Sequence, residues 1–264
     1  MNHRRSTVRS LLLTAACAVL SAPLAAQGPA LPPAQQILDR YAQAVGGRER
    51  IARYSSAHVV SEMEMPSIGM KATIESWAAK PNRSFVRMEL GAAGTTTMGF
   101  DGTVGWSNSA IQGPSLLEGA ELEQMREGSD FVEAISMIPD PAGYSAIETV
   151  ERTEMGGRVC YKVKLVRKSG RESFNCYDVE TGLLVGMSRT QETAMGKIET
   201  TAVVSDYKEF GGVMIPTRST GTMMGQQIVS TTRSVEFDTV QPSQFDLPQE
   251  IRALLAGSAR SPGR

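Results

Sequence analysis

Histidine, cysteine and aromatic residues are scarce in this sequence. Its 264 residues include two His, three Cys, two Trp, six Tyr and seven Phe. Three Cys are too few for a disulfide-stapled miniprotein or a repeated zinc framework. Outside the first residues the only histidine is His58, and an isolated His in a strand pattern is far more often structural than catalytic. A Ser-His-Asp or Cys-His catalytic site is therefore disfavoured.

An excess of charge of one sign is also lacking. The chain has 27 Lys+Arg against 28 Asp+Glu, for a net charge of −1. Without a basic excess to draw it onto a phosphate backbone, general nucleic-acid binding is excluded. The sequence contains no HExxH, CxxC, Gly-rich phosphate loop or GxSxG. These absences predict a protein that is not an enzyme and binds no cofactor or metal.

One apolar run is present near the start of the chain. Arg4, Arg5 and Arg9 precede the run 11–20, which is followed by small residues up to Gln27. This order is typical of a secretory signal peptide, 1–26, with cleavage after Ala26 and export to the periplasm. The run is too short to span a bilayer comfortably.

The remaining sequence is long enough for one large domain. After cleavage, 238 residues would carry a net charge of −4. Apolar residues make up 41% of the chain, which is enough for a packed core. No Pro/Gly/Ser-rich linker interrupts 35–250, so we expect a single domain, 27–256, and a disordered tail, 257–264.

The hydrophobic pattern predicts an antiparallel β protein with few helices. Apolar residues at helical spacing predict a helix between Pro33 and Gly46, and a helical insert is expected over 114–138, with its first helix over 115–126. Elsewhere the period is two, as in half-buried strands. Asp101-Gly102 predicts a hairpin with a type I′ turn. Another hairpin is expected around Ser169-Gly170, and a last helix over 249–255.

Methionine is almost as frequent as all aromatic residues together, with 14 in the chain. Met is unbranched and polarizable, so it adapts to irregular apolar ligands. A sheet lined by Met, Ile and Val could enclose an acyl-chain cavity, although alternation alone cannot distinguish a cavity from a filled core. The candidate ligand-binding residues are Met63, Met70, Ile74, Trp77, Val86, Met88, Met98 and Trp106. Each Trp could equally anchor the core.

Cys160 and Cys176 lie on the two arms of the hairpin around Ser169-Gly170, and a disulfide is possible in an exported protein. Register decides between two alternatives. A two-residue turn pairs Val163 with Cys176 and puts Cys160 on the other face, which forbids the bond. An odd-length loop sets Cys160 opposite Cys176 and allows it.

Several segments together resemble a known family. They are 77–87 (WAAKPNRSFVR), 100–106 (FDGTVGW), 178–184 (DVETGLL) and 211–216 (GGVMIP). They are similar, in order and spacing, to the bacterial outer-membrane lipoprotein-sorting proteins of the LolA-like periplasmic lipoprotein carrier superfamily. The resemblance covers most of 35–250.

The resemblance implies a mainly β fold of the α+β type. It consists of a strongly curved antiparallel sheet or incomplete β-barrel, whose N-terminal helix and helical insert cover an apolar cavity. It further implies periplasmic binding of lipid or lipoprotein acyl chains, transfer towards the outer membrane, and only peripheral or transient membrane contact. The alternative is an exported, non-catalytic protein–protein interaction module that binds envelope proteins. A hydrolase is a weaker third hypothesis, because the catalytic constellation is missing.

Overall fold

The computed structural model describes residues 30–193, 196–223 and 225–258. The predicted signal peptide lies outside this range, as does the tail from 259 onward. The chain divides into the units Met1–Ala30 and Leu31–Arg264, and only the second is described below. In the described residues, no helix is both long and apolar enough to cross a membrane.

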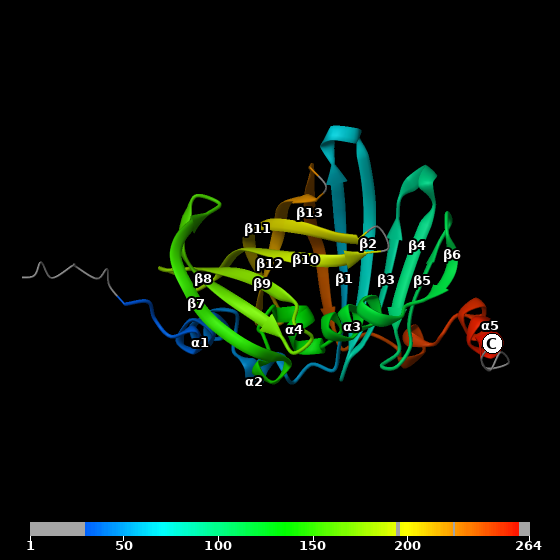
Figure 1. Cartoon of the computed structure of the whole chain (residues 1–264), viewed down its shortest axis with the longest axis horizontal. Coiled ribbons are helices and arrows are strands. Elements are labelled where there is room, and N and C mark those ends of the chain that lie inside the picture. The colour runs from blue at the N-terminus through cyan, green and yellow to red at the C-terminus, as the bar shows by residue number, and fades with distance from the viewer. Residues whose placement is uncertain (1–29, 194–195, 224, 259–264) are drawn as a thin grey trace, which may run out of the picture. The chain divides into compact units, whose positions relative to one another are not determined.

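A single antiparallel sheet dominates the unit (Figure 1), which confirms the predicted fold class. The strands lie in the order β6-β5-β4-β3-β2-β1-β13-β12-β11-β10-β9-β8-β7. Their bounds are β1 Ser56–Met65, β2 Met70–Ala79, β3 Arg83–Glu89, β4 Thr95–Phe100, β5 Gly105–Ser109, β6 Gly113–Leu116, β7 Tyr144–Met155, β8 Arg158–Arg167, β9 Glu172–Asp178, β10 Leu184–Thr193, β11 Gly196–Phe210, β12 Val213–Met223 and β13 Gln226–Phe237.

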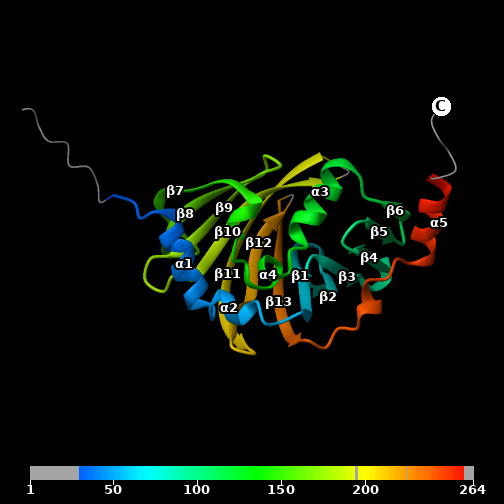
Figure 2. The same ribbon diagram turned by 90° about the horizontal axis from the view of Figure 1, so that it is seen from below.

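Within the described ranges, five α-helices accompany the sheet: α1 Ala34–Ala44, α2 Arg48–Ile51, α3 Gly119–Gly128, α4 Phe131–Ser136 and α5 Gln249–Ser258. Figure 2 shows the sheet curving around α3 and α4, which lie over one face. We call this the inner face and the opposite one the outer face, and we call α3 with α4 the cover. Because the cover joins β6 to β7, which are the two edge strands, it crosses the mouth of the sheet.

The structure corrects two local predictions. The Asp101-Gly102 hairpin is present, but its turn is not type I′, since Gly102 has a positive φ and Asp101 does not. Instead, the Asp101 carboxylate accepts hydrogen bonds from the backbone N–H groups of Thr103 and Val104, which fixes the turn. The helix predicted over 115–126 begins only at Gly119, because Gly113–Leu116 pairs with β5 as the edge strand β6.

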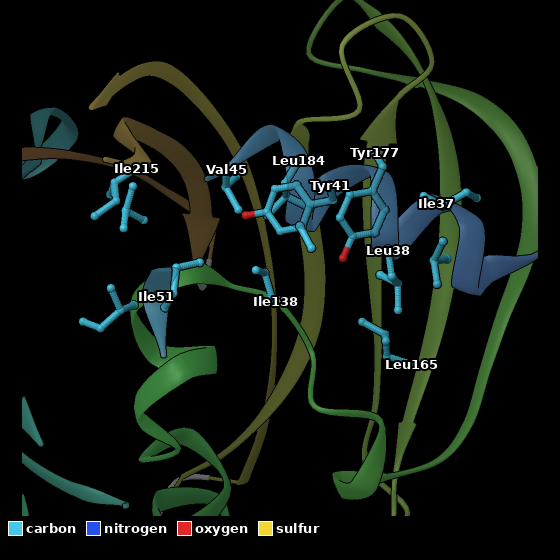
Figure 3. Packing of buried hydrophobic residues seen from close by; sticks show 14 of the residues in the cluster. Ile37, Leu38, Tyr41, Val45, Ile51, Ile138, Leu165, Tyr177, Leu184 and Ile215 are labelled. Carbon is cyan, nitrogen blue, oxygen red and sulfur yellow. The ribbon is translucent and has the colours of Figure 1, made fainter. Parts of the chain in front are cut away.

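The main core lies between α1 and the second half of the sheet (Figure 3). Leu38, Tyr41 and Val45 recur on one helix face and are fully buried. The Tyr41 ring lies 5.1 Å from the Tyr177 ring of β9, and the Tyr41 hydroxyl donates to the Ser136 carbonyl over 2.8 Å. This hydrogen bond holds α1 against α4, so the helix that builds the core also supports the cover.

Candidate functional site

A cavity of about 1020 Å³ lies between the inner face and the cover. This volume is at the upper end of the range of about 300–1,000 Å³ that is usual for small-molecule sites. Strands from both halves of the sheet contribute to its wall, as do both helices of the cover. The cavity is the candidate functional site.

One continuous row of residues crosses six strands and forms the wall on the β1–β6 side. Strand register sets each member directly opposite the next, and every one lines the cavity. The row is Val59, Ser76, Val86, Met98, Ser107 and Ser115. Since side chains alternate between the faces of a strand, this register fixes the row on the inner face. The wall is apolar at its middle and carries hydroxyl groups around it.

Helix α3 closes the cavity above this wall. Leu117, Met125 and Ser129 line the cavity from the cover side. The hydroxyls of Ser84 on β3 and Ser129 lie 2.7 Å apart and share a hydrogen bond. Ser129 is buried, so this contact is shielded from water and ties the end of α3 to the wall.

The opposite end of the cavity is strongly charged, on β7–β10. Arg171, in the loop before β9, forms an ion pair with Glu127 of α3, and Arg167 of β8 forms one with Glu133 of α4. The Arg167 guanidinium also lies 4.3 Å from the centre of the Tyr144 ring. These ion pairs attach each helix of the cover to the sheet.

Glu133 has the most unusual environment of these charges. Burial raises its pKa, whereas the Tyr144 hydroxyl and Arg167 oppose that shift. Among the described residues, its Oε2 atom is buried without a hydrogen-bond partner, as is Nε of Arg171. Buried polar groups normally have partners, so these two unused groups mark the charged end as a place where a ligand can bind.

The sequence-predicted methionines and aliphatic residues share the inner face. Register places Met63, Met70, Ile74, Val86, Met88 and Met98 on it. Val86 and Met98 line the main cavity. Met63 lines a second hollow of about 560 Å³ near the β1–β2 hairpin. Met70, Ile74 and Met88 are half-buried outside the main cavity wall. Ligand contact by any of them stays a prediction.

The two predicted tryptophans belong to a ring ladder on the outer face. The His58 and Trp77 rings stack with their centres 4.7 Å apart, and Phe85 lies between Trp77 and Trp106 at 5.3 and 5.9 Å. Trp77 borders the cavity, but its neighbours Ser76 and Ala78 present their side chains to the inner face. Trp106 is buried and does not line the cavity. These ring contacts join β1, β2, β3 and β5 on the outer face.

Both predicted registers of the cysteine hairpin were wrong. Four residues, 168–171, separate β8 from β9, and this loop pairs Lys162 with Cys176 and Cys160 with Asp178. The two cysteines are therefore diagonal neighbours on the outer face. Both are buried and free, and burial raises the pKa of each thiol. A disulfide in the exported protein stays a prediction.

The arginines of the charged end were not predicted from the sequence. Arg167, Arg171 and Arg189 occur in strand and hairpin segments where basic residues are common, and their partners lie far away in the sequence. Arg189 lies two residues after the inner-face residue Met187 on the same strand, so strand alternation could have placed it on the inner face. Among the described residues, no group of His, Cys, Asp and Glu could hold a metal ion.

Comparison with solved structures identifies the fold. The chain is similar to a LolA superfamily protein from Nitrosomonas europaea, with 12% identity and a TM-score of 0.55 over 82% of this chain and 99% of that one. It is similar to a DUF1329 family protein from Desulfovibrio piger, with 11% identity and a TM-score of 0.57 over 82% and 98%.

A third similar structure is a putative outer membrane lipoprotein-sorting protein domain from Vibrio parahaemolyticus. It has 12% identity and a TM-score of 0.51 over 81% of this chain and 97% of that one. No protein-family model matches the sequence. No curated protein matches it either. The chain has a LolA-like fold, and at these identities the likeness extends to the fold alone.

Proposed function

We propose that this protein binds the acyl chains of a lipid or lipoprotein in the cavity beneath α3 and α4. The observation that carries the proposal is the set of apolar residues that line the cavity: Val59, Val86 and Met98 on the wall, Leu117 just before α3, and Met125 on α3. Burying apolar surface there stabilises a bound chain by about 25 cal/mol per Å². The four methionines that line the cavity suit a flexible ligand, because Met repacks at low cost. They are Met98, Met125, Met137 and Met187.

Loading and release require the cover to move away from the sheet. Of its two helices, α4 is anchored in the main core by Phe131 and Ile135, whereas α3 buries none of residues 119–128. Polar contacts such as Arg171–Glu127 and Ser84–Ser129 attach α3 and its C-terminal end to the sheet. Segments with few buried contacts open at low free-energy cost. The fold therefore supports a carrier that takes up a chain and later releases it.

Two further observations support a periplasmic location for the protein. The first 26 residues have the order of a signal peptide, which predicts export. The Vibrio parahaemolyticus domain of the same fold is named for outer-membrane lipoprotein sorting. We therefore place the carrier in the periplasm, acting towards the outer membrane. An N-terminal sequence of the exported protein that began elsewhere than Gln27 would correct the cleavage site.

Native mass spectrometry of the protein purified from a bacterial periplasm tests the binding function. Co-purified lipid, or saturable binding of a neutral fluorescent naphthylamine probe, is the expected result. Met98→Asp should weaken probe binding at least tenfold, about 1.4 kcal/mol, because it introduces a charge into the apolar wall.

Thr97→Asp is the matched control, since Thr97 is the half-buried neighbour of Met98 on the outer face. It should leave probe binding unchanged. A folded protein that carries no lipid and binds no probe would overturn the proposal. That outcome would favour the interaction module instead.

A further inference from the structure

Arg189 presents a charged guanidinium to the cavity without a counter-ion among the described side chains. It lies on β10, opposite Ser173 of β9 and Thr200 of β11, and it lines the cavity. The ion pairs of the described residues engage Arg167 and Arg171, but none engages Arg189. A cation at a cavity wall without an acid beside it is the arrangement expected of an anion-binding site.

Arg171 is an electrostatically unfavourable neighbour for Arg189. Partial burial against the cavity wall and the like charge of Arg171 both lower the pKa of Arg189, while part of its side chain stays exposed to solvent. Two guanidinium groups of the same sign repel each other, and a bound anion would lower the free energy by interacting with both.

Arg171 supplies a second unused donor. Its terminal nitrogen binds Glu127, whereas its Nε atom is buried with no hydrogen-bond partner among the described residues. Ser173, which lies directly opposite Arg189 on β9, brings a hydroxyl group to the same end of the cavity. Hydroxyl groups and guanidinium donors together are the usual ligands of carboxylate and phosphate oxygens.

Two of the three acids that line the cavity are already paired. Glu133 is paired with Arg167 and Glu172 with Lys164 over 2.7 Å, whereas Glu121 of α3 has no ion pair among the described residues. Glu127 is occupied by Arg171. Arg189 and Arg218 therefore both line the cavity without an ion pair among the described residues, and of the two Arg189 lies beside Arg171 at the charged end.

We propose that the ligand is an amphiphile with an anionic head group, whose carboxylate or phosphate binds Arg189 with help from Arg171 while its tail lies along Val86 and Met98. This inference rests on the proposed function and adds the chemical class of the head group. A neutral lipid would leave the Arg189 guanidinium without a counter-ion.

Displacement of the neutral naphthylamine probe by monododecyl phosphate, dodecanol and inorganic phosphate tests the inference. We expect the wild-type protein to bind monododecyl phosphate at least tenfold more tightly than dodecanol, which has the same chain without the charge. Arg189→Gln should abolish this preference while leaving dodecanol binding intact. Arg152→Gln is the control, because Arg152 is exposed on β7 and does not line the cavity.

The outcomes separate the two proposals. Equal binding of monododecyl phosphate and dodecanol would overturn the head-group site but leave the acyl-chain cavity standing. Tight binding of inorganic phosphate alone, detected calorimetrically, would show a free-phosphate site and overturn the amphiphile. If neither dodecyl compound binds to the folded protein, the acyl-chain function itself fails. An unchanged preference in Arg189→Gln, with circular dichroism like that of the wild type, would also contradict the inference.

Discussion

The Tyr144 hydroxyl donates a 2.6 Å hydrogen bond to Oε1 of Glu133 and joins β7 to α4 of the cover. Arg167 contacts the same carboxylate oxygen and lies over the Tyr144 ring. Two strands and one helix therefore meet at a single buried carboxylate. Such a charge is tolerated only while its partners remain in place.

Tyr144→Phe should lower the free energy of unfolding at pH 7 by about 1.5–3 kcal/mol, the usual contribution of a hydrogen bond to a charged group. The loss is large because the buried Glu133 carboxyl group loses one of its hydrogen-bond donors. Urea denaturation measures it. Tyr161→Phe is the control, since the Tyr161 hydroxyl makes no hydrogen bond with the described residues, and it should be nearly neutral.

Glu127→Gln should loosen α3 without unfolding the sheet. The change removes the ion pair with Arg171, one of the contacts that hold the cover closed. Weakening this contact by about 1–2 kcal/mol would raise the population of the open state about 5- to 30-fold. Stopped-flow release of the naphthylamine probe should accelerate accordingly.

Glu123→Gln is the matched variant for Glu127→Gln. Glu123 pairs with Arg126 inside α3, so its loss does not detach the helix from the sheet. Equal release rates for the two variants would argue against the ion pair with Arg171 as a restraint on the cover.

Asp178 should make the fold sensitive to acid. Burial raises the pKa of this carboxyl, but the Arg158 guanidinium and the N–H groups of Thr181 and Glu180 outweigh burial and lower the pKa to about 2 from 3.8. A lowered folded-state pKa gives stability that is present above pH 4 and is lost as the pH falls towards 2.

The size of this effect is about 2 kcal/mol, at 1.36 kcal/mol per pKa unit. Asp178→Asn should therefore be less stable at pH 6 and should lose less stability than the wild type between pH 5 and pH 2. Thermal unfolding across that range provides the measurement. Parallel pH profiles for the two proteins would show that Asp178 does not titrate as described.

Gly46→Ala should destabilise the fold more than Gly47→Ala. Both residues follow α1 and have positive φ values, +111° and +90°, so either Ala would be strained. At Gly46 the new Cβ would also lie 2.3 Å from the Gly212 carbonyl oxygen, whereas nothing lies within 4 Å at Gly47. The backbone must shift only in the first case, and a difference of at least about 1 kcal/mol in urea is expected. Equal losses of stability in the two variants would show that the turn at Gly212 can shift without a free-energy cost.

Alternation along the strands was sufficient to predict the inner face. Met70, Ile74, Met88 and Met98 share that face as expected, because a period of two fixes the side of every residue once one is known. The same rule separates Trp77 from Ser76 and assigns it to the outer face. Trp77 and Trp106 were chosen as cavity candidates because they are large and apolar. Their positions in the strand alternation place both side chains on the outer face.

Features that depend on loop length or on distant partners could not be predicted. The cysteine hairpin has four loop residues where its Ser-Gly pair suggested two, and this shifted the register. Strand β6 contains Pro114 and only four residues, so its strand signal was weak. The ion pair of Arg171 with Glu127 joins segments that no local pattern connects.

The strand order carries a consequence for how the chain folds. Hydrogen-bonded neighbours in the sheet are consecutive along the sequence except for β1 and β13, where Ala57 faces Phe237. Hairpins form from local contacts, whereas joining two distant strands first costs the entropy of closing a long loop. We expect two meanders, β1–β6 and β7–β13, to assemble independently. Pairing of β1 with β13 then sets the folding rate. Until it occurs, the edges of β1 and β13 stay unpaired and are open to aggregation.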